Sequence, residues 1–271
     1  HGCNLLTIDV AQKGELKYLD VSTNKLSKIN VTQNSQLEYL NVANNSLTAV
    51  NVRNNTTLTY LNVNDNTAIN TIDVTKNTVL TELYATNLTI TDLNVSNNTL
   101  LTKLECHTNP NLTTLICSNS FPTSSMLLVA DMGLKLYNNN GEAQAYHIGD
   151  LIKVGDVWGV VYSGESTTKI VSYTATTALS SDAETWCSNY GLGWYLPSRD
   201  ELNMIYNNKS TINSTLSAYG YTALDTGAHT SLHWSSTYRE QWGLWAVALS
   251  DGRAKTLDSD VVCNVRAVLA F

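Results

Sequence analysis

Short apolar triplets with a polar centre recur through the first part of the chain, mostly as Leu or Ile, then Asp or Asn, then Val. They begin at Ile8, Leu19, Ile29, Leu40, Val50, Leu61, Ile72, Leu93, Leu104 and Leu115, so most follow one another after 10 or 11 residues. Two such units make one coil of 21 or 22 residues. A short fixed period of this kind predicts a solenoid, in which neighbouring coils stack on one another.

An asparagine stands three residues after most of the valines that end these triplets. The set comprises Asn24, Asn34, Asn45, Asn55, Asn66, Asn77, Asn98 and Asn109. An inward asparagine at one repeated coil position can bond the backbone groups that a turn leaves unpaired. The pattern therefore predicts asparagine ladders inside the solenoid.

The pattern Leu37-x-x-Leu40-x-Val42-x-x-Asn45-x-Leu47 resembles bacterial leucine-rich repeats, and the resemblance covers roughly residues 5 to 120. About five coils are expected, stacked at the ~4.8 Å spacing of β-strands. The segment from residue 80 to 101 departs from the pattern, because the run from Tyr84 to Asn87 is one residue out of register. A local bulge is expected there.

Tyrosines occupy outward positions on the expected strands. They are Tyr18, Tyr39, Tyr60 and Tyr84, and polar residues such as Asp20 stand beside them. This row has two interpretations, a strip that binds a ligand or stacked side chains that only support neighbouring coils. Cys106 and Cys117 stand where other repeats have valine, and we interpret them as core thiols.

Composition divides the chain in two. All six tryptophans lie after residue 150, and the repeats end near Pro122. We therefore expect two domains, a leucine-rich repeat solenoid over residues 1–122 and a second domain over residues 123–271. The net charge of −7 includes no basic stripe, which argues against a nucleic-acid partner. No apolar run approaches the ~20 residues of a membrane span, although Gly2-Cys3 fits the lipid-anchoring site of a bacterial lipoprotein.

The second domain has the pattern of an α+β fold. Apolar runs over residues 157–162 and 169–173 predict strands, and the serine-to-glutamate spacings at residues 181–184 and 198–201 match the capping box of a helix start. A third, short helix is expected over residues 212–219. Residues 245–249 and 253–257 flank Asp251-Gly252, which predicts a hairpin with a two-residue turn.

The hairpin alternation assigns its side chains to two faces. The core face holds Trp245, Val247, Leu249 and Ala254. The other face holds Ala246, Ala248, Ser250, Arg253, Lys255 and Leu257, beside a loop with Tyr238, Arg239 and Trp242. Tyr, Trp and Arg dominate binding hot spots, so this second face predicts a ligand surface, with an ordinary solvated sheet face as the alternative.

The run from Gly193 to Leu202, the motif His233-Trp234-Ser235-Ser236-Thr237 and the segment Val265-Arg266-Ala267-Val268 resemble a bacterial C-type-lectin-like family. That family is related to the formylglycine-generating enzyme fold and to the variable proteins of diversity-generating retroelements. The resemblance spans about residues 145 to 271 and implies a small twisted sheet with two helices. Its framework residues would be Trp194, Pro197, Trp234, Ser235, Ser236, Trp245, Gly252 and Arg266. Its ligand surface would be Tyr238, Arg239, Glu240, Gln241, Trp242, Ala246, Ala248, Arg253, Lys255, Leu257, Asp258 and Asn264.

Catalytic and metal chemistry finds little support in the sequence. The calcium-binding motifs of sugar-binding C-type lectins are missing, and His229 and His233 lie four apart in an expected loop rather than on a zinc-binding helix. Cys187 and Cys263 are the only cysteines of the second domain. A disulfide between helix and last strand is common in lectin-like folds, and two unpaired thiols are the alternative. We expect no cofactor and no metal.

These observations predict a secreted or surface-anchored, non-enzymatic bacterial protein that resembles an adhesin and acts as a monomer. Its second domain would recognise a protein or a glycan. One alternative is an enzyme of the formylglycine-generating type. Another is binding by the tyrosine row of the solenoid, with the second domain as a cap.

Overall fold

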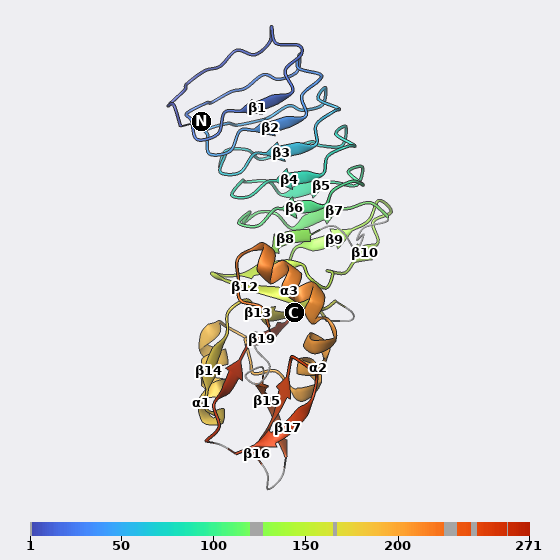
Figure 1. Ribbon diagram of the computed structural model, residues 1–271. Helices are drawn as coiled ribbons and strands as arrows, with labels where there is room; N and C mark the ends of the chain where they lie inside the picture. The colour runs from blue at the N-terminus through green and yellow to red at the C-terminus, as the bar shows by residue number, and fades with distance from the viewer. Residues whose placement is uncertain (1, 120–126, 165–166, 225–231, 240–242, 259) are drawn as a thin grey trace. The chain divides into compact units, whose positions relative to one another are not determined.

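The chain forms two compact units, His1–Gln144 and Ala145–Phe271. The computed structural model describes residues 2–119, 127–164, 167–224, 232–239, 243–258 and 260–271 (Figure 1). The boundary lies beyond the expected one at residues 122 and 123. The reason is that Leu127–Asp131 (β8) and Lys135–Tyr137 (β9) extend the parallel ladders of the repeats.

The first unit is a β-solenoid, and its stacked coils confirm the prediction from the repeat. Six strands pair in parallel as successive rungs (Figure 1). In order they are Tyr18–Asp20 (β1), Tyr39–Asn41 (β2), Tyr60–Asn62 (β3), Glu82–Tyr84 (β4), Lys103–Glu105 (β6) and β8. A second, shorter ladder contains Asp92–Asn94 (β5), Thr114–Ile116 (β7), β9 and the antiparallel Ala143–Gln144 (β10).

Each three-residue rung buries its central residue and turns its two outer residues outward. Leu40, Leu61, Leu83 and Leu104 are fully buried at this central position. Burial of one leucine side chain contributes roughly 1.5–3 kcal/mol, and neighbouring coils repeat that contribution. The outer residues of the same rungs are then available as a continuous surface.

The predicted asparagine ladders are present, and there are two of them. In the first, formed by Asn24, Asn45, Asn66 and Asn109, each amide oxygen accepts a hydrogen bond from the N–H of a residue in the preceding coil, and each amide nitrogen donates to a carbonyl of its own coil. Asn45 accepts a hydrogen bond from the N–H of Leu26 (3.0 Å) and donates to the carbonyls of Val21 and Val42 (both 3.0 Å). Leu88 replaces asparagine in one coil, and its N–H donates to Oδ1 of Asn109 (2.8 Å).

The second ladder, formed by Asn34, Asn55, Asn77 and Asn98, satisfies carbonyl groups only. Asn55 is fully buried and donates to the carbonyls of Val31 (2.9 Å) and Asn34 (2.7 Å). The buried Oδ1 atom of each of the four has no hydrogen-bond partner among the described residues. Each side-chain NH₂ group therefore offsets the free-energy cost of burying carbonyls at the turn, while the Oδ1 atom of the same side chain stays without a hydrogen bond.

The expected bulge near Tyr84 is absent from the described coils. Leu83 pairs with Leu61 on one side and with Leu104 on the other, in unbroken register. The extra residue of this coil lies in the preceding turn, because Ile69 follows Asn66 by three positions, whereas Leu26 follows Asn24 and Leu47 follows Asn45 by two. Residue insertions are absorbed in a turn at lower cost than in a ladder, whose hydrogen bonds they would break.

Over its described residues, the second unit contains two sheets and three helices, which confirms the expected α+β composition. The first sheet has the order Leu151–Val154 (β11), Val157–Ser163 (β12), Lys169–Ser172 (β13) and Val268–Ala270 (β19). The second has the order Thr176–Ala178 (β14), Cys263–Val265 (β18), Leu232–Arg239 (β15), Gly243–Ala248 (β16) and Ala254–Leu257 (β17).

The helices are Ser180–Tyr190 (α1), Arg199–Asn207 (α2) and Lys209–Ala218 (α3). The capping box predicted at the start of α2 is present, with Ser198 and Glu201 bonding each other's backbone amides. The one predicted for α1 is wrong, because that helix begins after Leu179 without a side-chain cap. The third helix starts three residues earlier than predicted, since Asn208 already follows α2 directly.

The predicted hairpin of β16 and β17 is present, but its turn is longer than predicted. Ala246 pairs with Lys255 and Val247 with Ala254, so Ala248 stands opposite Arg253 and four residues form the loop. The two-residue turn is therefore wrong. The shift is an even number of residues, so each side chain keeps its predicted face. Ala254, expected in the core, is nevertheless exposed, because it lies at the outer strand of the sheet.

Candidate ligand-binding surfaces

The tyrosines of the first unit form one connected strip, which we define as Tyr18, Tyr39, Tyr60 and Tyr84. The rings of Tyr18 and Tyr39 are stacked with centroids 4.1 Å apart, and those of Tyr39 and Tyr60 are 4.2 Å apart, both pairs at 10°. Tyr84 stands at the other outer position of its rung, opposite Asn62, and its ring is tilted 40° to that of Tyr60 at 5.3 Å. The parallel register positions these rings, because it pairs Tyr18 with Tyr39 and Tyr39 with Tyr60 on neighbouring rungs.

The stacking decides which part of each ring is free. Rings that overlap face to face cover one another's faces, so the strip presents ring edges and hydroxyl groups. Tyr18 is the most exposed, at 59 %, and Tyr39 and Tyr60 are half-buried. The hydrogen bond to Tyr39 raises the pKa of Tyr18, and burial raises the pKa of Tyr39. The hydroxyl groups of Tyr18 and Tyr39 are therefore protonated at neutral pH, as donors and acceptors.

Charged side chains flank the strip. Lys103 lies 4.9 Å from the ring centroid of Tyr84 and 2.9 Å from a carboxylate oxygen of Glu105. The Tyr84 hydroxyl donates to Glu82 (2.6 Å), and burial raises the pKa of that hydroxyl well above its usual range. The strip thus combines aromatic edges at one end with a hydrogen-bonded cluster of charges at the other.

Asp20 stands beside the strip and remains ionised. Burial alone would raise its pKa, but hydrogen bonds from the hydroxyl and N–H of Ser22 and from the amide of Asn41 outweigh that effect and lower it. On the adjacent row Lys17 bonds Glu38 at 2.8 Å, with both side chains largely exposed. Such exposed pairs contribute little to stability. Their main effect is to place a positive and a negative charge beside the strip.

The ligand surface expected on the second unit is only partly assembled. Tyr238, which lies in β15 rather than in the expected loop, is 67 % exposed, and Arg253, Lys255 and Asp258 are also exposed. The half-buried members are Ala248, Leu257 and Asn264, of which Asn264 donates its amide to the carbonyl of Leu232 (3.2 Å). Glu240, Gln241, Trp242 and the side chain of Arg239 lie outside the described residues.

Ala246 does not belong to a displayed surface. It is fully buried, because it stands directly opposite Trp234, which is also fully buried. The indole N–H of Trp234 donates to the carbonyl of Ala178 (2.9 Å) and thereby ties β15 to β14. The alternation placed Ala246 on the right face but could not show that this face is covered over β15 and β16.

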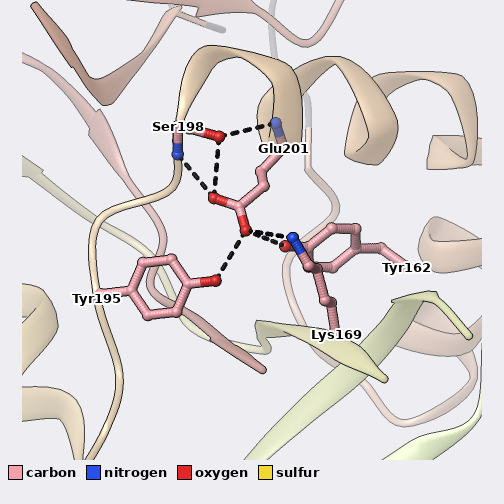
Figure 2. Close-up of polar contacts among 5 residues, drawn as sticks. All are labelled: Tyr162, Lys169, Tyr195, Ser198 and Glu201. Carbon is pink, nitrogen blue, oxygen red and sulfur yellow. Dashed lines mark hydrogen bonds and ion pairs between the residues drawn. The ribbon is translucent and has the colours of Figure 1, made fainter. Parts of the chain in front are cut away.

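The buried framework converges on the carboxylate of Glu201, at the start of α2. Figure 2 shows one oxygen accepting from Lys169 (2.9 Å), Tyr195 (2.7 Å) and Tyr162 (3.4 Å). The other oxygen accepts from the N–H (2.9 Å) and hydroxyl (3.0 Å) of Ser198. Burial opposes ionisation, but these bonds prevail and hold the pKa of Glu201 below its usual value. This cluster fixes the start of α2 to β12 and β13.

From that fixed start, α2 and α3 hold the hairpin sheet at several points. The N–H of Arg199 donates to Thr237 in β15 (2.9 Å), and its guanidinium lies 5.3 Å from the ring of Trp245 in β16. The ammonium of Lys209 bonds the carbonyls of Leu249 (2.9 Å) and Ser250 (2.7 Å) in the hairpin turn. These contacts attach β15, β16 and the turn that leads into β17 to the two helices.

Arg266 is a second buried anchor, expected as framework and found 2 % exposed. Its guanidinium donates to the carbonyls of Ser172 (2.7 Å), Thr222 (2.8 Å) and Ala223 (3.2 Å). Burial lowers its pKa to about 10, so it remains charged at neutral pH. The sequence predicts Arg266 as a framework residue. It does not predict that Glu201 is the centre of a buried cluster, because only the bond between Glu201 and Ser198 follows from local spacing.

Cys187 and Cys263 are buried free thiols in the structure, the second of the two alternatives. Burial raises the pKa of Cys187 to about 12 and that of Cys263 to about 11. His233 lies buried in β15 rather than in the expected loop, and His229 lies outside the described residues. Within the described ranges, no group of three His, Cys, Asp or Glu residues could hold a metal ion. Over the same residues no helix is long and apolar enough to span a membrane.

No protein-family model matches the chain, and no curated protein matches it. Among solved structures, 14 chains match. One is described as the functional domain of InlJ from Listeria monocytogenes, which includes a cysteine ladder; it is 25% identical and has a TM-score of 0.32. The match covers 48% of this chain and 47% of that one, about half of its length.

Proposed function

We propose that the protein is a non-enzymatic bacterial binding protein, secreted or surface-anchored, whose solenoid binds a protein ligand through the tyrosine strip. The observation that carries this proposal is the stack of Tyr18, Tyr39 and Tyr60 on consecutive rungs, with hydroxyl groups and ring edges turned outward. Tyrosine supplies a large, rigid and amphipathic contact area at low entropic cost, and protein-binding surfaces use it for that reason.

The stacked geometry favours a protein over a glycan as ligand. A sugar ring packs best on an uncovered aromatic face, whereas Tyr39 has a neighbouring ring on both sides. Edges, hydroxyl groups and the nearby Asn41 and Asn62 offer hydrogen bonds of the kind that protein surfaces exchange.

The finer fold assignments belong to the same proposal. The first unit is a leucine-rich repeat solenoid, supported by the buried leucines and the asparagine ladders. The second unit is a C-type-lectin-like domain, supported by the burial of Trp194, Trp234 and Arg266 at framework positions. The rival enzyme needs a reactive thiolate, and the raised pKa values of Cys187 and Cys263 disfavour one.

A second ligand surface on the hairpin sheet of the second unit is favoured by the exposure of Tyr238, Arg253 and Lys255. The rigid attachment of this sheet to α2 and α3 suits a binding platform, because side chains on a fixed scaffold lose less entropy on binding. This surface is the lectin-like alternative to the strip, and one experiment separates the two.

The test is a binding screen of the full chain on arrays of purified extracellular proteins and of glycans. A Tyr39→Ser, Tyr60→Ser double variant is compared with a matched Tyr238→Ser variant, and circular dichroism checks the fold of each. We expect a protein hit that weakens at least about tenfold in the double variant, the loss of roughly 1.4 kcal/mol, and is unchanged in Tyr238→Ser. A hit lost only in Tyr238→Ser would transfer the function to the second unit.

A further inference from the structure

The outer strand of the hairpin sheet, β17, has an open edge. The sheet order ends at β17, which pairs with β16 alone among the strands that the structure describes. Its residues Ala254 and Lys255, and Arg253 just before them, are exposed, and Thr256 and Leu257 are half-buried. A strand edge of this kind presents unpaired N–H and C=O groups, to which an extended segment can add as a further strand.

The register identifies which backbone groups face the edge. The N–H of Ala248 donates to the carbonyl of Arg253 (2.8 Å), so residues 248 and 253 form a hydrogen-bonded pair. Hydrogen-bonded and non-bonded pairs alternate in an antiparallel ladder, so Lys255 and Leu257 also point their backbone groups toward β16. The backbone groups of Ala254 and Thr256 therefore point outward, at the open edge.

Side-chain charge indicates the kind of segment that fits. Arg253 and Lys255 lie two residues apart and so share one face of the hairpin. The Arg253 side chain is 88% exposed, and its contact with Asp251 is long, at 3.6 Å. Two β17 edges brought together would oppose like charges, which disfavours self-pairing. A strand with acidic side chains at alternate positions would place opposite charges beside both cations.

We propose that β17 is a docking edge for an extended, acidic segment of a partner protein, which adds as a sixth strand to the sheet of β14, β18, β15, β16 and β17. Backbone hydrogen bonds from Ala254 and Thr256 supply affinity, and Arg253 and Lys255 supply selectivity. The rigid hold of Lys209 on the hairpin turn keeps the edge extended before binding. This edge is separate from the tyrosine strip and does not depend on it.

The probe is a fluorescein-labelled peptide, Thr-Glu-Val-Glu-Val-Glu-Thr, with blocked ends. Its charge-reversed control carries Lys in place of Glu. Fluorescence anisotropy with the full chain should show saturable binding of the acidic peptide only, weakened several-fold when NaCl is raised from about 50 to about 500 mM. Equal binding of both peptides, or of neither, would overturn the proposal.

A proline variant tests the backbone contact. Thr256→Pro removes one outward N–H and leaves the ladder to β16 intact, since proline is tolerated at an open edge. We expect probe binding to weaken about five- to tenfold, the effect of one lost hydrogen bond. A Lys255→Gln variant should weaken binding without changing the ladder, and the Tyr39→Ser variant should bind the probe normally. Normal binding by a folded Thr256→Pro protein contradicts the proposal.

Hydrogen exchange on the unaltered protein makes the test independent of variant folding. Amides of Lys255 and Leu257 face β16 and should exchange slowly with or without the probe. Amides of Ala254 and Thr256 should exchange rapidly alone and become protected at least about tenfold with saturating peptide. Protection that fails to appear at these two amides would show that the peptide binds elsewhere.

Discussion

At the scale of single residues, local spacing encodes some partners and hides others. The bond between Ser198 and Glu201 follows from a capping box that is visible in the sequence. The bonds from Lys169 and Tyr195 to the same carboxylate cannot be inferred from spacing, because those residues come from other elements and meet Glu201 only in the folded unit. Ala246 illustrates the same point, since its burial depends on Trp234 across the strand pair.

The Glu201 cluster makes stability depend on pH. Glu201→Gln should lower the free energy of unfolding of the second unit at pH 7 by about 1–3 kcal/mol. This is less than the usual cost of breaking a fully buried ion pair, because the side chain of Lys169 is 27% exposed. The folded-state pKa lies below the ordinary value of 4.5. The contribution is therefore fully present above about pH 4.5 and is lost as pH falls through the folded pKa.

Urea unfolding followed by tryptophan fluorescence, from pH 7 down to pH 3, measures this effect. The stability difference between the original protein and Glu201→Gln should shrink toward zero at the acid end. A difference that stays constant over that range would mean that the ionised carboxylate has no role in the cluster. Asp200→Asn, on the exposed side of the same helix, is the matched control and should change stability by less than about 0.5 kcal/mol.

At the scale of elements, periodicity predicts the strands well and turn chemistry predicts their connections less well. The triplet period locates the buried leucine of each rung, because a shift of one residue along the strand would turn that leucine outward. The hairpin is correctly paired by its alternation, but its turn contains four residues, since Leu249 is buried and Gly252 must adopt a positive φ of 76°. Asp251-Gly252 is a signal for a turn and does not by itself determine its length.

Gly252 is held by both its backbone and its neighbour. A Cβ at this position would lie 2.6 Å from Cε1 of Tyr206, in addition to the strain of a positive φ. Gly252→Ala should therefore destabilise the second unit by about 2–3 kcal/mol. In a Tyr206→Ala background the clash disappears, so the same change should cost only the backbone part, roughly 1 kcal/mol. Equal costs in both backgrounds, measured by thermal unfolding, would contradict the role of Tyr206.

At the scale of the whole molecule, residue composition alone separates the two units. Tryptophan is confined to the second unit, and the asparagine ladders are confined to the first. The position of the boundary could not be predicted, because β8 and β9 lack the triplet pattern yet still pair with the rungs before them. Parallel pairing depends on backbone position, and a strand can join a ladder without repeating its sequence.

This division gives each unit its own spectroscopic signal. Asn55→Ala removes two hydrogen bonds to buried carbonyls and should destabilise the first unit by about 2–4 kcal/mol. Far-ultraviolet circular dichroism should show that loss, whereas the midpoint from tryptophan fluorescence should not move, because each unit has its own core. The neighbouring Asn54→Ala, whose amide is exposed and makes one bond to Thr32, should have a smaller effect on both signals. If the fluorescence midpoint falls together with the dichroism, the two units unfold as one cooperative body, and the strip and the β17 edge would then have to be tested as coupled surfaces.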